Sequence, residues 1–341
     1  MRLDNSSPYI IAEVGQNHQG SLQEALKYVV TFGALGASAV KFQMRDNKVL
    51  FDKSVYDMSY ESVNAFADTY GAHREFLELE NSDFITLRNR CKELGVDFIV
   101  TPFDIPSLKR CVELKVDALK IASFDLGNLS LLNELAQTKI PLIMSTGGGS
   151  LEHVKASVEI ITKHHNSLAV LHCVSLYPCP VEAVNLGNIS TLQKTFPGLN
   201  IGLSDHFNGT LTGPLAYTLG ARIFEKHVTF DRSQKGTDHP FSLEPEGFRK
   251  FVRDINRVET LMSSGHHSKL GNEFVFQKLG KSIICKRDLP AGHVLSHSDL
   301  DGKICRPTVL PVRETLNVIG KKLTEPMSAG SYISFDCLQD A

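Results

Sequence analysis

The chain has 341 residues, of which 42% are hydrophobic and 22% charged, and its formal net charge is −2. This globular composition excludes a disordered chain, and the charge balance excludes a bulk basic field for nucleic acid or an anionic membrane surface. At roughly 150 residues per domain, the length predicts about two domains.

The first residues are polar, and no apolar run approaches the roughly 18 residues that a membrane span needs. The seven cysteines form no CxxC pair, and their spacing matches neither a disulfide framework nor a zinc knuckle. Reduced thiols are typical of the cytoplasm. We therefore expect a cytoplasmic protein that binds neither membrane nor nucleic acid.

Short apolar runs alternate with longer amphipathic stretches along most of the chain. The runs have the near-continuous apolar or β-branched character of strands that are buried on both faces. We expect eight strands, at 9–14, 37–43, 97–102, 118–122, 141–146, 168–173, 200–204 and 221–227. We expect eight helices, at 21–33, 82–94, 105–114, 130–137, 150–164, 188–196, 209–219 and 246–263.

This alternation over about 260 residues predicts an α/β fold, a (β/α)8 TIM barrel. A doubly wound sheet is the alternative, but no GxGxxG follows the first predicted strand. Ser21 and Glu24 have capping-box spacing at the start of the first helix, and Gly95 follows the second helix as a C′ glycine does. The long polar-aromatic segment 44–82 predicts a lid or an insertion with its own helix.

The alternation ends after residue 263. Residues 264–268 (SGHHS) are typical of a linker, and from residue 279 the chain changes to short β-like runs with turns at 290–292 and 328–330. The predicted organisation is a catalytic barrel at 1–264, a linker at 265–278 and a small, mostly β domain at 279–341.

Polar side chains occur at or just after the end of every predicted strand. In a TIM barrel the carboxyl ends of the strands form the active-site face, and packing alone would tolerate apolar residues there. These polar residues include Glu13, Lys41, Gln43, Thr101, Lys120, Ser123, Asp125, Ser145, Thr146, His172, Ser175, Tyr177, Ser204, Asp205, His206, Glu225, Lys226 and His227.

Two lysines and several hydroxyls at one mouth suit a compact anion with several charges. Lys41 and Lys120 would supply charge, and the hydroxyls would supply directional donors. A phosphate together with a carboxylate would use them all. The triplet GGG at 147–149 would let backbone N–H groups approach such a ligand, although a flexible turn also explains the triplet.

His206 and His227 lie at the ends of adjacent predicted strands. Two neutral imidazoles leave coordination positions open for an oxygen-rich substrate on a catalytic divalent ion. We therefore predict a weak, open metal site at this pair, with no cysteine beside it. For His18 and His239, ligand contact and a structural role both stay open.

Ten short motifs follow one another along the chain. They are IAEVGQNHQG (11–20), VKFQ (40–43), TPFD (101–104), LKIAS (119–123), MSTGG (144–148), LHCVSLYP (171–178), GLSDH (202–206), EKHVTFDR (225–232), KGTDH (235–239) and SLEP (242–245). In this order they closely resemble the N-acetylneuraminate (sialic acid) synthase family. The segment GKSIICKRDLPAGHVLSHSDL (280–300) resembles the antifreeze-like (SAF) domain of that family.

The resemblance implies a TIM barrel followed by an SAF domain. It implies an enzyme that condenses phosphoenolpyruvate with N-acetylmannosamine or a related acyl-amino sugar, giving a nine-carbon sialic acid and phosphate. It further implies a divalent metal, Mn2+ first and Mg2+ or Co2+ as alternatives, and a domain-swapped homodimer.

The resemblance also implies roles for individual residues. Phosphoenolpyruvate would be bound by Lys41, Thr101, Lys120, Ser123, Ser145, Ser175 and Ser204, and the metal by His206 and His227. The sugar and the reacting centre would face Glu13, Gln43, Phe103, Asp125, Tyr177 and Asp238. Arg306 would reach the N-acyl group of the sugar from the partner subunit. Glu13 or Asp238 would steer the attacking water or accept its proton.

Three positions depart from the family pattern. Phe124 stands where many members have Gly, Asp125 where bacterial members often have Glu, and Ser175 where some have Asn. These changes bear on the amino sugar more than on the reaction, so a legionaminate, pseudaminate or spore-coat acid synthase stays an alternative. A metal-dependent hydrolase or isomerase would not need two lysines and a ring of hydroxyls, and a non-enzymatic binding module would not need the barrel.

Overall fold

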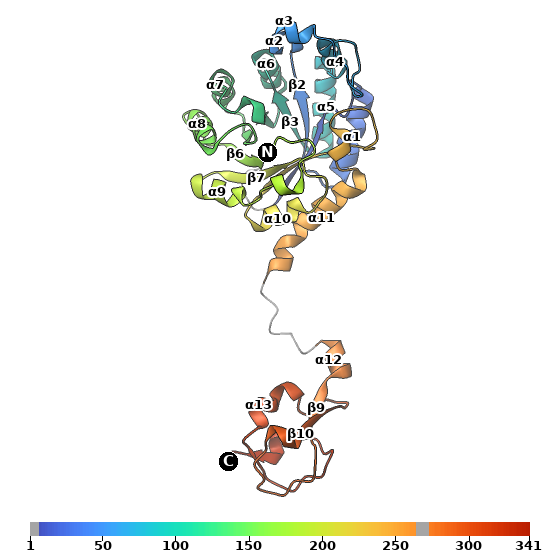
Figure 1. Ribbon diagram of the computed structural model, residues 1–341, viewed down its shortest axis with the longest axis vertical. Helices are drawn as coiled ribbons and strands as arrows, with labels where there is room; N and C mark the ends of the chain where they lie inside the picture. The colour runs from blue at the N-terminus through green and yellow to red at the C-terminus, as the bar shows by residue number, and fades with distance from the viewer. Residues whose placement is uncertain (1–6, 264–272) are drawn as a thin grey trace. The chain divides into compact units, whose positions relative to one another are not determined.

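The computed structural model describes residues 7–263 and 273–341 and forms two compact units, Met1–Met262 and Ser263–Ala341. In the first unit eight parallel strands close a barrel in which each strand pairs with the next and the first pairs with the last (Figure 1). The strands are β1 (Tyr9–Gly15), β2 (Ala39–Met44), β3 (Asp97–Pro102), β4 (Ala118–Ile121), β5 (Leu142–Ser145), β6 (Leu168–Cys173), β7 (Asn200–Asp205) and β8 (Ile223–His227).

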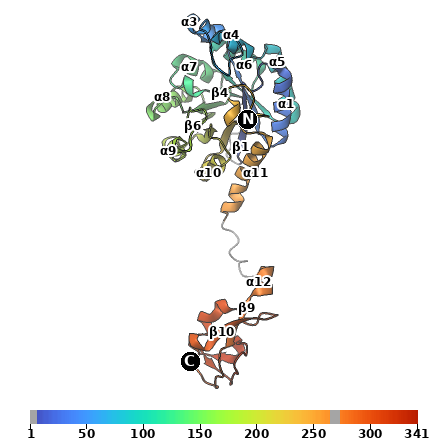
Figure 2. The same cartoon turned by 45° about the vertical axis from the view of Figure 1, so that its right-hand side comes forward.

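Helices surround this barrel, as the turned view in Figure 2 also shows. One follows each strand: α1 (Leu22–Ala34), α5 (Asn81–Leu94), α6 (Ile105–Leu114), α7 (Leu129–Gln137), α8 (Leu151–Thr162), α9 (Asn188–Thr195), α10 (Thr212–Thr218) and α11 (Pro245–Met262). The predicted TIM barrel is therefore confirmed. Of the capping box expected at α1, the structure gives the bond from the Glu24 backbone N–H to Ser21 Oγ, and Gly95 ends α5 in the left-handed conformation.

Two apolar cores hold the barrel unit together. The larger one lies between the strands and the helices, where residues such as Val40, Phe98 and Phe224 meet helical residues such as Phe32 and Phe251. The smaller one fills the inside of the barrel with aliphatic side chains from different strands. Because these side chains fill the inside of the barrel at this level, the barrel is closed there. The carboxyl ends of the strands remain available for chemistry.

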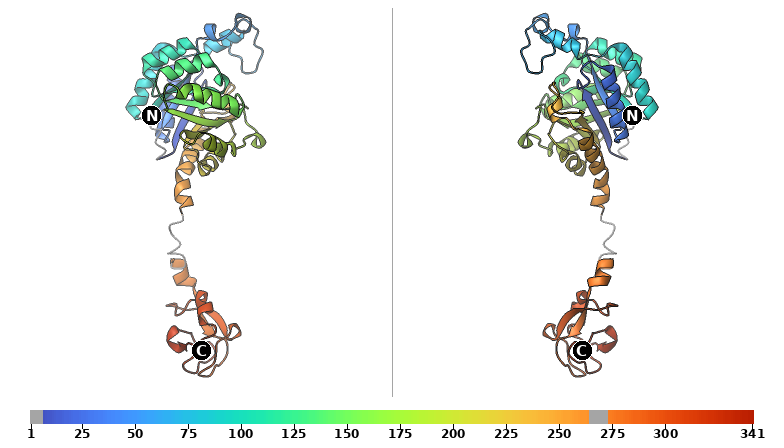
Figure 3. Two further views of the ribbon diagram at one scale, coloured as in Figure 1. Left: turned by 90° about the vertical axis from the view of Figure 1, so that its left-hand side faces the viewer. Right: turned by 90° about the vertical axis from the view of Figure 1, so that its right-hand side faces the viewer.

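The segment between β2 and α5 forms its own small helices, as expected for an insertion. These are α2 (Asn47–Leu50), α3 (Lys53–Tyr56) and α4 (Tyr70–Phe76), and in Figure 3 this region stands out from the rest of the barrel unit. Aromatic contacts hold the insertion together: the rings of Phe51 and Tyr70 meet edge to face at 5.2 Å, and those of Phe66 and Phe76 stack at 4.9 Å.

The second unit has its own core, which includes Ile283, Leu295 and Ile333. Its regular elements are α12 (Phe274–Leu279), β9 (Lys281–Cys285), β10 (Leu300–Ile304), α13 (Thr315–Val318), β11 (Lys322–Leu323) and β12 (Leu338–Gln339). The strands form two small antiparallel sheets, as expected for a mostly β module. Of the predicted linker at 265–278, residues 265–272 lie outside the described residues, and part of the remainder forms α12, which the sequence analysis did not predict.

Short 3-10 turns complete both units. They are η1 (Ser123–Asp125), η2 (Val181–Ala183), η3 (His239–Phe241), η5 (His297–Asp299), η6 (Val312–Glu314) and η7 (Phe335–Cys337). Within the described residues, no helix has the length and apolar character to cross a membrane. All seven cysteines lie in described parts of the chain and carry free thiols.

Candidate active site

Alternation along the strands places two layers of side chains inside the barrel. The lower layer is aliphatic and includes Ile11, Ala39, Ile99, Ala118, Ile143, Leu171 and Ile223. Two residues farther along the strands lies an upper layer of Glu13, Lys41, Thr101, Lys120, Ser145, Cys173, Ser204 and Glu225, all of which are buried. The upper layer contains five of the seven residues expected to bind phosphoenolpyruvate.

The two lysines of the upper layer are paired with two carboxylates. Lys41 Nζ lies 2.7 Å from Glu13 Oε2 and 3.7 Å from Glu225 Oε2, and it donates to Thr101 Oγ1 at 3.2 Å. Lys120 Nζ lies 3.9 Å from Glu225 Oε1 and donates to Ser145 Oγ at 2.6 Å. We expected the two lysines to supply charge to an anionic ligand and gave Glu225, one of the polar strand-end residues, no role. The spacing in EKH could have found it, since Glu225 must face the same side as His227.

The two carboxylates differ in their protonation behaviour. Burial and the neighbouring Glu225 raise the pKa of Glu13 above its usual value, although Lys41 acts in the opposite direction. For Glu225, burial would raise the pKa, but Lys120 and Lys41 outweigh it and hold the value well below normal. Of the two carboxylates, Glu13 is therefore the one better suited to take up a proton.

The loop after β5 approaches η1 so closely that it requires glycine. The Gly147 N–H donates to Ser123 Oγ at 3.1 Å, and a Cβ at Gly147 would lie 2.4 Å from Ser175 Oγ. A Cβ at Gly148 would lie only 1.9 Å from the carbonyl oxygen of Ser123. The glycine triplet is therefore more than a flexible turn: it brings backbone and hydroxyl donors together.

Three of the polar strand-end residues point away from the mouth. Lys226 Nζ and Asp205 Oδ2 form a buried ion pair at 2.6 Å on the outer side of the barrel, and His172 Nε2 lies 2.8 Å from the Val184 carbonyl oxygen. They alternate with Cys173, Ser204 and Glu225, which face inward. The expectation that all strand-end polar residues line one mouth is therefore wrong for these three, because successive residues of a strand face opposite sides.

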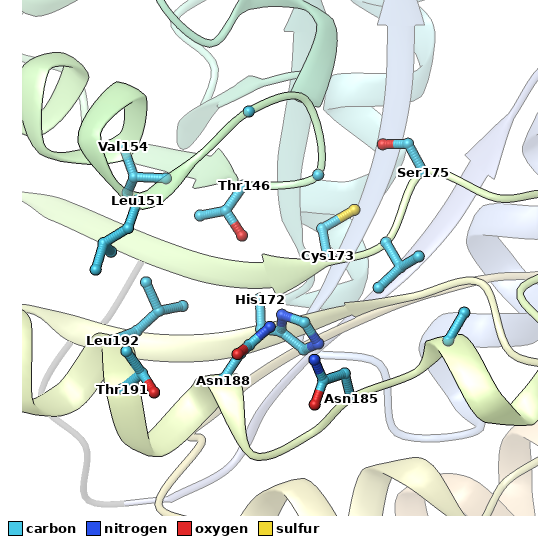
Figure 4. Close-up of a pocket in the computed structure, with 14 residues that line it drawn as sticks. Thr146, Leu151, Val154, His172, Cys173, Ser175, Asn185, Asn188, Thr191 and Leu192 are labelled. Carbon is cyan, nitrogen blue, oxygen red and sulfur yellow. The ribbon is translucent and has the colours of Figure 1, made fainter.

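His172 and Thr146 instead line a side cavity of about 380 Å3. The cavity involves β6 and the helices α8 and α9, with Leu151 and Val154 from α8 and Leu192 from α9 among its lining (Figure 4). Cys173 and Ser175 also border it. None of the residues that line this cavity lines the second cavity, which lies above the upper layer.

Above the upper layer lies a cavity of about 600 Å3. Six of the expected site residues line it: Gln43, Phe103, Asp125, Tyr177, His227 and Asp238. Burial raises the pKa of Asp125, which accepts a hydrogen bond of 3.0 Å from Asn128 Nδ2. Gln43 Nε2 donates to Glu13 Oε1 at 2.8 Å and so connects this cavity to the layer below.

His206 and His227 lie side by side with ring centroids 5.4 Å apart. His206 Nδ1 lies 2.8 Å from the Val174 carbonyl, which can only accept, so in the neutral ring Nε2 carries the lone pair. Burial lowers the pKa of His227 to about 3, and its Nδ1 lies 3.7 Å from Asp238 Oδ2. Imidazole nitrogens are ligands that divalent transition metals prefer.

Within the described ranges, no cluster of three His, Cys, Asp or Glu residues is arranged as a metal site. Two imidazoles alone fit an open site that is completed by substrate or water. The expectation of no cysteine nearby is wrong, because Cys173 Sγ lies 4.0 Å from His206 Nδ1. Although burial disfavours charge on both groups, their contact lowers the pKa of Cys173 to about 7 and raises that of His206.

The two undecided histidines make structural contacts. His18 Nδ1 accepts from the Gly20 N–H at 3.1 Å, and His239 Nδ1 lies 2.7 Å from Thr229 Oγ1.

Arg306 lies in the second unit, where it is exposed and donates to the Lys278 carbonyl at 3.4 Å. Sequence reasoning missed Arg74, which lines the upper cavity from the insertion and carried no local signal.

Two family models match this chain. The NeuB family model matches residues 29–267, and the SAF domain model matches residues 280–339. The chain is 36% identical to the N-acetylneuraminate-9-phosphate synthase of Drosophila melanogaster, covering 96% of each protein. It is 35% identical to the N,N'-diacetyllegionaminic acid synthase of Legionella pneumophila, covering 97% of this chain and 94% of that protein.

A solved structure is also similar. The N-acetylneuraminic acid (sialic acid) synthetase of Leptospira borgpetersenii, in complex with citrate, aligns with a TM-score of 0.70 and 32% identity. The alignment covers 79% of this chain and 90% of that one.

Proposed function

The chain belongs to the NeuB family, and on this premise we propose that it condenses phosphoenolpyruvate with N-acetylmannosamine or a related acyl-amino sugar. The products are a nine-carbon sialic acid and inorganic phosphate. The observation that carries the proposal is the buried ring of lysines and hydroxyls beside the His206–His227 pair. Such a ring suits a phosphate and a carboxylate, and the cavity above it has room for a sugar.

In this reaction C3 of phosphoenolpyruvate attacks the aldehyde carbon of the open-chain sugar, and a C–C bond forms. Positive charge develops at C2, where water adds, and the tetrahedral intermediate loses phosphate by cleavage of its C–O bond. Lys41, Lys120 and the neighbouring hydroxyls orient the phosphate and offset the charge of the leaving group. Glu13, with its raised pKa, is suited to accept the proton of the attacking water.

A divalent ion, Mn2+ first, is part of the proposal, with His206 and His227 as its ligands. When bound, it would act as a Lewis acid toward the aldehyde oxygen. The adjacent imidazole rings of His206 and His227, the latter with a pKa lowered by burial, support this assignment. Asp238, which lies beside His227, would face the sugar at the reacting carbon.

A substrate panel tests the proposal. Release of inorganic phosphate is measured with phosphoenolpyruvate and, in turn, N-acetylmannosamine, its 6-phosphate and 2,4-diacetamido-trideoxy-hexoses. We expect release that requires one of the sugars, stops with EDTA and returns with Mn2+. Release without any sugar would indicate a phosphatase instead, and full activity in EDTA would contradict the metal. Relatives at 36% and 35% identity bear names for different products, so overall identity does not choose the sugar.

A domain-swapped homodimer completes the proposal. Phe124 in η1 and Leu176 in the segment after β6 are 74% and 47% exposed and would gain from a cover that also excludes water. The partner's C-terminal module, carrying Arg306, would be that cover. An Arg306→Ala protein mixed with a His206→Ala/His227→Ala protein should regain activity on subunit exchange. No recovery despite demonstrated exchange would show that each module serves its own chain.

A further inference from the structure

Arg74 brings a buried guanidinium with unused donors to the cavity above the upper layer. It lies in α4 of the insertion, and its side chain is 9% exposed. Its Nη1 donates to Gln16 Oε1 at 2.9 Å, whereas its buried Nε and Nη2 atoms have no hydrogen-bond partner among the described residues. Because a buried N–H without an acceptor costs free energy, these donors point to a ligand.

A second guanidinium, that of Arg45, lines the same cavity. Its side chain is 8% exposed and lies over the Phe103 ring, with 4.0 Å from Cζ to the ring centroid. It donates to Glu78 Oε1 at 3.3 Å and to the side-chain oxygen of Gln43. Through Gln43, Arg45 is connected to the reacting layer below.

The two arginines share one close carboxylate. Glu78 Oε1 lies 3.3 Å from Arg45 Nη1 and 3.9 Å from Arg74 Nη2. Burial and the neighbouring Arg74 lower the pKa of Arg45 to about 10, while Glu78 and Asp238, which lines the same cavity, oppose the shift. Among the described residues, the two guanidiniums thus share a single carboxylate within 4.0 Å, and an anion would give them a second partner.

We infer that Arg45 and Arg74 bind a phosphate group at the far end of the amino sugar, so that the substrate class is a hexosamine phosphorylated on its terminal hydroxyl. The inference rests on the proposed function, since His227 and Asp238 in the same cavity would face the aldehyde end. A guanidinium presents a planar fork of donors that matches phosphate oxygens, and two of them fit a dianion.

A neutral hydroxyl at that end would not use this arrangement. It would leave at least one guanidinium N–H without an acceptor and would offset no charge. Condensation adds three carbons ahead of the aldehyde carbon, so a phosphate on C6 of the sugar becomes a phosphate on C9 of the product. The inferred product is thus a 9-phosphorylated ulosonic acid.

Kinetics with two sugars test the inference. The specificity constants of N-acetylmannosamine 6-phosphate and N-acetylmannosamine are measured with saturating phosphoenolpyruvate and Mn2+. The full-length wild type should prefer the phosphorylated sugar, and Arg74→Met should reduce that preference about 10- to 150-fold, as expected for lost charge-assisted hydrogen bonds. The change should be mainly in KM for the phosphorylated sugar, with kcat less affected.

Matched variants separate binding from folding. Arg88→Met removes an arginine of α5 that does not line the cavity, and it should keep the wild-type preference. Arg74→Lys should retain part of the preference, since it keeps the charge without the fork. If Arg74→Met does not fold, Arg74→Gln gives the same readout.

The outcomes distinguish the inference from the function on which it rests. Consumption of neither sugar, nor of any other amino sugar in the panel, would overturn the proposed function itself. Turnover of N-acetylmannosamine without preference for its phosphate would overturn the inference alone. So would an Arg74→Met variant that slows both sugars equally, because that result would make Arg74 a structural residue.

Discussion

The lower and upper layers inside the barrel are built by the same strands, yet their properties are opposite. In the lower layer Ile11, Ile99 and Ile143 are fully buried against aliphatic neighbours. Two residues farther along, about 7 Å by the rise of a strand, these strands carry the buried polar residues Glu13, Thr101 and Ser145, in a layer that also holds buried lysines. The lower layer gains free energy by excluding water, whereas the upper layer pays a desolvation penalty that ion pairs offset in part. Stability and chemistry are thus separated along each strand.

Glu225→Gln should have the largest effect on this contrast. It removes the closest carboxylate partner of Lys120 and one of the two partners of Lys41, at an expected cost of about 3–5 kcal/mol in free energy of unfolding. Urea denaturation at pH 7 measures this cost. An unchanged urea midpoint would mean that the ion pairs of Glu225 with the two lysines do not contribute to stability.

We also expect Glu225→Gln to change how stability depends on pH. Because the folded pKa of Glu225 is depressed below its ordinary value of 4.5, its contribution to stability is present above that value. The contribution is lost as the pH falls through the folded pKa. Wild type should therefore lose more stability than Glu225→Gln on acidification below about pH 4.5. Parallel acid-unfolding curves would contradict the ion pairing.

Ile99→Ala tests the lower layer. Truncation of this fully buried side chain should reduce the free energy of unfolding by about 2–5 kcal/mol, and the milder Ile99→Val by about 0.5–1.5 kcal/mol. At a temperature where the variants stay folded, KM for phosphoenolpyruvate should not change. A large change in that KM would show that the two layers are not independent.

Lys41→Met should have a smaller effect than Glu225→Gln or Ile99→Ala, and the most selective one. Loss of a charge-assisted contact of about 1.5–3 kcal/mol should raise KM for phosphoenolpyruvate about 10- to 150-fold, and far more than KM for the sugar. Lys226→Met is the control, because its buried ammonium pairs with Asp205 outside the barrel. An equal rise of KM in both variants would remove the distinction between inward and outward lysines.

The sequence by itself determined most of the architecture, because hydrophobic periodicity is a local property. The predicted strands at 97–102 and 168–173 coincide with Asp97–Pro102 and Leu168–Cys173, and the predicted helix at 105–114 coincides with Ile105–Leu114. The motif order led to the sialic acid synthase family, and the family comparison confirms that membership. Residues such as Lys41 and Lys120 were found because they lie near the carboxyl ends of predicted buried strands.

Only the tertiary structure decided what these residues meet. Alternation along each strand turned Lys226 outward and Glu225 inward, and closure of the barrel then brought Glu225 to both lysines across strands far apart in sequence. Arg74 reaches the cavity from an insertion whose path depends on packing rather than on periodicity. A sequence pattern records the spacing of residues on one element, whereas ion pairs and cavities depend on which elements pack together in space.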